Sequence, residues 1–516
     1  MCNNPLFHSA EWTVEDIDNA WEVIDNLAKS KYGLDYYPPA IEIVTADQMI
    51  LASAQTGMPI MYEHWSFGKS FIEMQRQYQQ GVSGLAYEMV INTNPSVCYI
   101  MEDNSSTMQA LVLAHAACGH SSFFKNNYLF KQWTDPDGMI NYLKYAKKFI
   151  AECYAEDEKS TEVILDFCHR MKYNGVFKYK RYHKNKDMIE RETENLRKIT
   201  EESVNDLLDT AVGKAKKGEE LSSVLDFTDF GVLEEDYLKE PEENILYAIE
   251  KSSKLITDKE REIIRIVRTI GQYFYPQIQT KVMNEGWASF WHYTLMTDLH
   301  EEGYISEGNY LEFLHSHTGV VNQLSYKQTR SVNPYVLGFK MFMDIKRICE
   351  APDAEDLELF SEICNTDWLT TLKDIAANYR DESFIRQFLS PKVAKDLKLF
   401  VLEDDEFQDT YVIKATQSDR DFKTLRAELA NHYVWERMFF SIEVAALSDD
   451  GIADIVVILE EGQAMDSDTY LFLEEDLLGY FTEVKLNVTS RKDLNELFGG
   501  SLKKFIKQTI KDNTRG

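Results

Sequence analysis

The sequence has few cysteines, and none of them forms a recognisable pair. Seven cysteines are scattered along 516 residues, odd in number and without a Cys-x-x-Cys motif. This pattern argues against a disulfide framework and against a four-cysteine zinc site, and it is typical of a reducing compartment. We therefore expect a cytoplasmic protein.

Positive charge is also scarce. Lys and Arg total 55 against 86 Asp and Glu, which gives a net charge of -31. A surface of this sign repels phosphate backbones, so no nucleic-acid binding is expected. The basic run at 178–184 opens a charged segment of about 178–240 that we interpret as an exposed insertion. A solvated face explains the basic run better than contact with an acidic partner.

Several familiar patterns are missing. No run of about 18 apolar residues is present, and the N-terminus shows no secretory signal, so no membrane insertion is expected. The GxxxxGK[ST], GxGxxG and GxSxG motifs are absent, which argues against the usual nucleotide-binding loops and against a nucleophile elbow.

What remains is a long chain with 44% hydrophobic residues, enough for two or more folded cores. The periodicity predicts an α+β protein with a mainly helical core at 1–395 and a short strand edge at 88–92 and 97–101. The segment 396–516 reads as strand-strand-helix-strand-strand-helix-strand. We expect a small α/β sandwich there, with helices on one face of an antiparallel sheet.

Two separated segments carry candidate metal ligands. His115 and His120 end an apolar helical run, and Glu285 and His292 lie on a later helix. Seven residues apart, Glu285 and His292 differ by about 20° and share a helix face. His115 and His120, five apart, differ by about 140° and converge only if the helix bulges or ends near Gly119.

These residues predict a site for zinc or another divalent transition metal, with His115, His120 and Glu285 as ligands. Ala116 occupies the position where an HExxH helix carries its general base. Glu88, from the strand edge, or His292 would then supply the acid/base or a fourth ligand. Of His315 and His317, at most one can join the site. The alternative is structural, with Glu and His making separate hydrogen bonds in the core.

The same segments resemble the SpoVR family, which comprises stage V sporulation protein R and its relatives in bacteria that do not sporulate. The resemblance covers about residues 10–400, and its motifs lie at residues 84–95, 115–130, 242–247, 272–277, 283–288, 313–318, 333–339, 344–349 and 381–391.

This resemblance implies a link to the spore cortex, a peptidoglycan layer, or to stress physiology. It also implies protein partners, namely the serine kinase and von Willebrand-type protein that accompany relatives in their operons. The segment around Glu285 looks in addition like the third-ligand helix of gluzincin metallopeptidases, although Ala116 and the five-residue histidine spacing depart from that pattern.

Two functions therefore stand side by side. One is a metal-dependent hydrolase, or a degenerate relative of one, that lacks the usual general-base Glu. The other is a non-catalytic regulatory scaffold in cell-wall or stress signalling, with structural histidines and a partner-binding C-terminal module.

Overall fold

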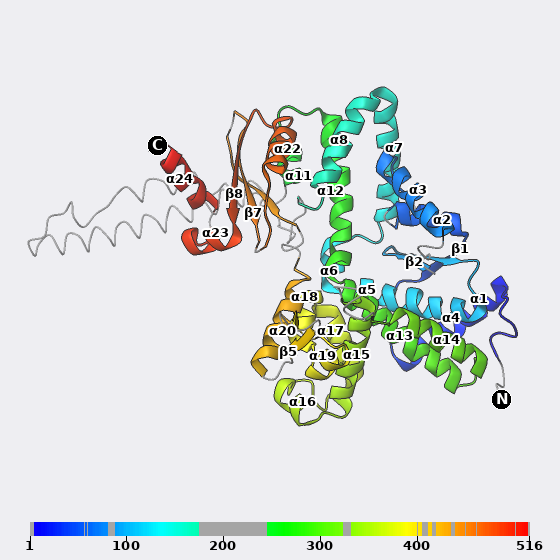
Figure 1. Cartoon of the computed structure of the whole chain (residues 1–516). Coiled ribbons are helices and arrows are strands. Elements are labelled where there is room, and N and C mark those ends of the chain that lie inside the picture. Colours follow the sequence, from blue (N-terminus) through cyan, green and yellow to red (C-terminus); the bar gives the residue numbers. More distant parts are fainter. Residues whose placement is uncertain are drawn as a thin grey trace, which may run out of the picture. The chain divides into compact units, whose positions relative to one another are not determined.

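The computed structural model describes residues 5–55, 57–58, 60–80, 88–174, 245–323, 332–399, 401–404, 411–414, 419–434, 439–448, 450–460, 462–500 and 502–513. The insertion predicted at about 178–240 lies outside them. The chain divides into two compact units (Figure 1). The first comprises residues 1–166 and 269–438, and the second comprises residues 167–268 and 439–516. The boundary predicted at 396 falls inside the first unit.

Helices dominate the first unit. Its elements in chain order are α1 (Val14–Asn26), η1 (Leu27–Lys31), β1 (Pro39–Val44), α2 (Ala46–Ala54), α3 (Trp65–Gln79), β2 (Glu88–Ile91), β3 (Ser96–Met101), α4 (Ser106–Val112), η2 (Leu113–His120), α5 (Ser121–Asn126), α6 (Tyr128–Trp133), α7 (Met139–Glu156), α13 (Lys281–Glu301), α14 (Glu307–Val320), α15 (Pro334–Glu350), α16 (Ala354–Leu359), α17 (Trp368–Asn378), α18 (Asp381–Phe388), α19 (Pro391–Asp396), β4 (Val401–Asp404), β5 (Tyr411–Lys414) and α20 (Asp419–Asn431). Both η elements are π-helices. The helices α8 (Glu158–Met171) and α12 (Asp258–Gln279) each begin in one unit and end in the other.

The predicted strand edge is present as a three-stranded sheet in the order β1-β3-β2. β2 pairs antiparallel with β3, and Glu88 lies opposite Ile100. β1 pairs parallel with β3. β2 is therefore an edge strand, and Glu88 is its first residue.

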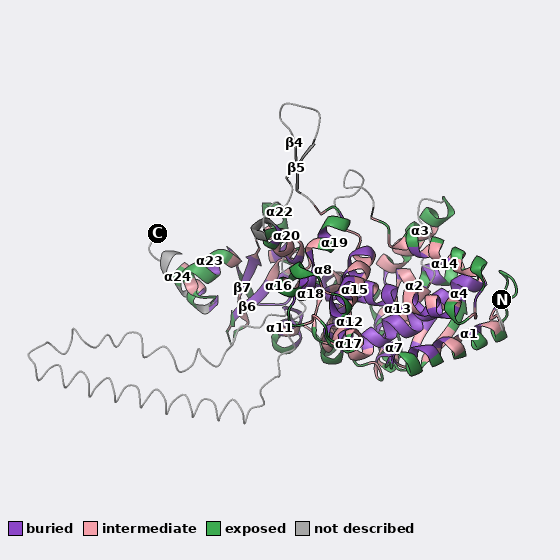
Figure 2. Ribbon diagram, turned by 90° about the horizontal axis from the view of Figure 1, so that it is seen from below, coloured by how far each residue is buried: buried purple, intermediate pink, exposed green. Residues whose placement is uncertain are grey.

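The core of the first unit is built around α13. Large apolar side chains on several sides of this helix are buried, including Trp287, Phe290 and Trp291, and Figure 2 draws most of its ribbon as buried. A helix that is buried on several sides lacks a single polar face. It packs against α15, α14 and η2.

Three glycines let these backbones approach closely. A Cβ at Gly119 of η2 would lie 2.6 Å from the Cα of Ala288 on α13. Gly286 and Gly338 face each other where α13 crosses α15, and a Cβ on either would clash with the backbone of the other. Larger residues at these positions would push the helices apart. The glycines therefore bring α13 against both neighbours at the level of Glu285.

The second unit is a smaller α/β arrangement. Its elements are the end of α8, α11 (Ile245–Ser252), the start of α12, β6 (Ser441–Leu447), β7 (Ile452–Leu459), α22 (Ser467–Leu478), β8 (Glu483–Ser490), α23 (Arg491–Phe498) and α24 (Leu502–Asn513). Its sheet has the order β6-β7-β8. β6 and β7 are antiparallel, and β7 and β8 are parallel.

The prediction of one antiparallel sheet in the C-terminal region is wrong. β4 and β5 form a separate two-stranded sheet within the first unit, and β8 runs parallel to β7 because the helix α22 lies between them in the chain. Such a crossover returns the chain in the same direction, as parallel pairing requires. Helices on only one face were also expected. Val456 and Ile458 face α23 and α24, yet Ile455 and Val457, which alternate to the other face, are equally buried.

Within the described ranges, no helix has the length and apolar character needed to cross a membrane. The six cysteines in those ranges are all free.

Candidate metal centre

The histidine pair lies where the helical run of residues 106–126 widens into a π-helix. η2 spans Leu113–His120 between α4 and α5, and all eight of its residues are buried. A π-helix joins residues five apart by its hydrogen bonds, so such residues stack along one face. The rings of His115 and His120 accordingly approach to 4.6 Å between centroids. Of the two alternatives, a bulge or a helix end near Gly119, the structure shows the bulge, which brings residues five apart onto one face.

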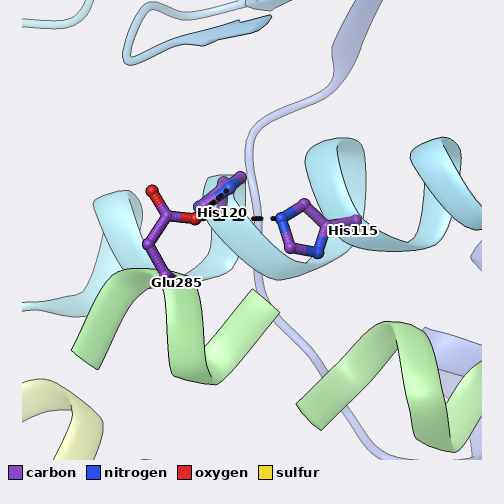
Figure 3. Close-up of side chains that lie close together, drawn as sticks. All are labelled: His115, His120 and Glu285. Carbon is purple, nitrogen blue, oxygen red and sulfur yellow. Dashed lines mark ion pairs between the residues drawn. The ribbon is translucent and has the colours of Figure 1, made fainter. Parts of the chain in front are cut away.

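Glu285 reaches this pair from α13 (Figure 3). Its Oε2 lies 3.5 Å from Nε2 of His120 and 4.0 Å from Nε2 of His115. One ligand atom from each of the three residues lies within 4.8 Å of the other two. Atoms around one tetrahedral zinc, with bonds of about 2.0–2.1 Å, are about 3.3 Å apart. The two nitrogen–oxygen distances of 3.5 and 4.0 Å are somewhat longer than this, so the three groups would draw together slightly around an ion.

The second nitrogen of each ring is held by α13. Nδ1 of His120 donates to Oδ1 of Asn284 at 2.9 Å, and Nδ1 of His115 lies 2.7 Å from Nδ1 of His292. An amide oxygen accepts only, so the proton of a neutral His120 ring sits on Nδ1 and its Nε2 lone pair faces Glu285. Outer partners of this kind orient histidine ligands at metal sites.

Glu285 itself carries an unsatisfied atom. Its Oε2 is buried and has no hydrogen-bond partner, while Tyr335 of α15 makes a hydrogen bond to the same side chain. A buried carboxylate oxygen without a donor is costly. A divalent cation placed among Glu285, His115 and His120 would satisfy it, so the residues present fit such an ion.

Three histidines of this region, His115, His292 and His317, are kept neutral by their surroundings. Burial lowers the pKa of His115 well below its ordinary value, and the neighbouring imidazoles of His120, His292 and His317 lower it further. Burial has the same effect on the pKa of His292 and brings the pKa of His317 to about 4. Neutral imidazole is the metal-binding form.

Glu88 approaches His115 from the edge strand β2. Its Oε1 lies 3.7 Å from Nε2 of His115. Burial, followed by repulsion from Glu285, raises the pKa of Glu88 to about 8. The site therefore contains a second carboxyl group, and its affinity for a proton is higher than that of an ordinary glutamate.

The other histidines predicted near the site, His292, His315 and His317, lie in different surroundings. His292 contacts His115 and His317. Its Nδ1 lies 2.7 Å from Nδ1 of His115, and its Nε2 lies 2.7 Å from Nδ1 of His317. Of the α14 pair, His317 contacts His292 but supplies no atom to the group of three ligands, and His315 is exposed. The sequence reading did not identify Asn284 or Tyr335. The only available signal for Asn284 was its position directly before Glu285.

A second group that could hold a metal consists of His64, Glu162 and Asp166. His64 is the N-cap of α3, and its Nδ1 accepts from the backbone N–H of Ser66. The proton of the neutral ring then sits on Nε2, which lies 3.2 Å from Oδ1 of Asp166. That arrangement uses both nitrogens and connects α3 with α8, so we assign this group a structural role.

The fold and this centre define an α+β protein with a buried histidine–carboxylate site suited to a divalent transition metal. Comparison with known sequences then gives the family. The family described as "SpoVR like protein" matches residues 11–438. The Escherichia coli (strain K12) protein named "Uncharacterized protein YcgB" is 47% identical over 434 residues, which cover 83% of this chain and 82% of that protein.

The chain belongs to the SpoVR family. No solved structure matches it, so the resemblance to gluzincin metallopeptidases finds no support among known structures.

Proposed function

We propose that the protein is a metal-dependent hydrolase whose ion, zinc or another divalent transition metal, is bound by His115, His120 and Glu285. The observation that carries the proposal is the convergence of two imidazole nitrogens with a buried carboxylate oxygen that lacks a donor. Two nitrogens and one oxygen are an ordinary zinc donor set, and three protein ligands leave a coordination position open, as a catalytic zinc requires.

When bound, such an ion lowers the pKa of a coordinated water and polarises a substrate carbonyl. The chain itself must then supply proton transfer. Ala116 cannot do so, but Glu88 lies on the Nε2 side of His115. Glu88 would act as the general acid/base from β2, in place of the helix-borne Glu of HExxH enzymes.

His292 has a different role in this proposal. Both of its ring nitrogens are within hydrogen-bond distance of other histidines, His115 and His317. This geometry favours support of a ligand over direct contact with a substrate.

The setting of the reaction is proposed from the family. Spore cortex, peptidoglycan more generally, or stress physiology would supply the substrate, in the cytoplasm. The serine kinase and von Willebrand-type companions would be protein partners. The competing proposal is a non-catalytic regulatory scaffold in cell-wall or stress signalling. It assigns the histidines a structural role and the binding of partners to the C-terminal module.

Elemental analysis of the purified full chain separates the two proposals. We expect about one transition-metal ion per chain, reduced strongly by His115→Gln and unchanged by His315→Gln, an exposed histidine on α14. A content below ~0.2 ion per chain that His115→Gln does not change would overturn the metal-site proposal.

A further variant tests the proposed hydrolytic activity. Glu88→Gln keeps the shape of the side chain but cannot exchange a proton. It should retain the metal and lose hydrolysis of peptidoglycan fragments by at least about a hundredfold. Retained hydrolysis would exclude Glu88 as the acid/base.

A further inference from the structure

Three buried histidines form a continuous hydrogen-bonded chain in the first unit. His115 of η2 contacts His292 of α13 through their Nδ1 atoms at 2.7 Å, and Nε2 of His292 contacts Nδ1 of His317 of α14 at 2.7 Å. All three rings are at most 5% exposed. The chain therefore connects the candidate ligand His115 to a helix that contributes no ligand.

Each of these two nitrogen–nitrogen hydrogen bonds has a single proton, which belongs to one of the two rings. A neutral imidazole has one N–H and one accepting nitrogen, and buried rings avoid the charged form unless they have an anionic partner. The chain consequently has two arrangements. In one, Nδ1 of His115 donates to His292 and Nε2 of His292 donates to His317, so Nε2 of His115 is unprotonated. In the other, Nδ1 of His317 donates to His292 and Nδ1 of His292 donates to His115. The proton of His115 then sits on Nε2, and that nitrogen cannot bind a metal.

A backbone group also contacts the first ring of this chain of histidines. The ring of His115 also makes a hydrogen bond to the backbone of Ala288, one turn before His292 on α13. A carbonyl oxygen only accepts, so the contact favours a proton on the ring nitrogen that faces this turn.

The far end of the chain is held by aromatic packing. The ring of His317 lies 4.8 Å from that of Phe339, 5.1 Å from Tyr293 and 5.7 Å from Phe313, between centroids. Such packing fixes the orientation of the ring, so that Nδ1 stays aimed at His292.

We propose that His292 and His317 are positioning residues that hold His115 in the tautomer with its proton on Nδ1, which leaves Nε2 available as a ligand. The inference rests on the proposed metal site and extends it by two rings, to α14. No ring changes its charge. Removing the acceptor at His317 permits the reversed arrangement, in which the proton moves to Nε2 of His115.

The test uses the full chain and three variants. His317→Leu removes the acceptor, His317→Asn can place an amide oxygen near the position of Nδ1, and His315→Leu is the matched control on the exposed side of α14. Zn²⁺ affinity is measured by competition with a chromophoric chelator. Histidine ¹⁵N spectra of the metal-free chain give the tautomer of each ring.

We expect His317→Leu to weaken Zn²⁺ binding by about 10–100-fold, the usual effect of losing an outer partner. It should also shift the His115 signals toward the tautomer protonated on Nε2. His317→Asn should restore both properties to within about threefold, and His315→Leu should match the wild type.

Unchanged affinity and tautomer in His317→Leu would overturn the inference. So would equal losses in the Leu and Asn variants, since packing alone would then explain them. A wild-type chain that binds no Zn²⁺ contradicts the proposed function instead. In that case the tautomer of His115 in the metal-free wild type and in His317→Leu decides the inference by itself.

Discussion

Replacing Gly119 by alanine tests whether the site depends on the close approach of η2 to α13. A Cβ at this position would lie 2.6 Å from Cα and 2.9 Å from Cβ of Ala288. Carbon atoms in contact are about 3.5–4.0 Å apart, so the two backbones must separate by roughly 1 Å. The obstruction is backbone, which cannot rotate away as a flexible side chain can.

The expected loss of stability follows from this overlap. Overpacking a filled core costs about 1–3 kcal/mol, which exceeds the roughly 0.5–1 kcal/mol that alanine gains over glycine within a helix. Separation by roughly 1 Å also moves His120 away from Glu285, so Zn²⁺ affinity should fall by about tenfold or more.

Gly319 supplies the matched control. It also lies in a helix, α14, but a Cβ there would meet nothing within 4 Å. Gly319→Ala should therefore stabilise the protein by roughly 0.5 kcal/mol and leave Zn²⁺ affinity unchanged. The two glycine substitutions thus have opposite expected signs.

Tryptophan fluorescence during urea unfolding measures the stability change of each glycine variant in the first unit of the chain. The eight tryptophans of the chain all fall within the residue ranges of the first unit, so the signal excludes the second unit. If Gly119→Ala unfolds at the same urea concentration as the wild type and binds Zn²⁺ equally well, close helix contact does not build the site.

Three further predictions concern buried polar groups. Glu285→Gln should abolish stoichiometric Zn²⁺ binding yet stabilise the metal-free first unit by about 1 kcal/mol, because it replaces a carboxyl group whose buried Oε2 has no hydrogen-bond partner; a less stable variant in the tryptophan assay would contradict this. Asn284→Leu should free the His120 ring and weaken Zn²⁺ binding by about tenfold in the chelator assay. Burial raises the pKa of Glu250, but Arg268 and other cations outweigh it and hold the folded-state pKa below the ordinary 4.5. Its contribution to stability is therefore complete above about pH 4.5 and lost as the pH falls, and near-ultraviolet circular dichroism in urea should show a smaller pH dependence for Glu250→Gln.

Much of the local structure is determined by sequence pattern. Thr13 caps α1 in a capping box with Asp16, and the strands predicted at 88–92 and 97–101 are present as β2 and β3. These features depend on contacts between residues a few positions apart, which periodicity and capping signals report directly. The sheet of the second unit shows the limit. The pattern located its strands but not their order or direction, because pairing depends on crossovers between distant segments.

The candidate site divides in the same way. The sequence alone identified His115, His120 and Glu285 and showed that a regular helix cannot bring the two histidines together. Only the tertiary structure decided how they meet, through the π-helix η2 and the contact of Gly119 with Ala288. It also added Asn284 and His317 as partners of the rings. The physical reason is that ligand geometry depends on distances between segments more than 160 residues apart. Helix packing sets those distances, and local periodicity carries no record of them.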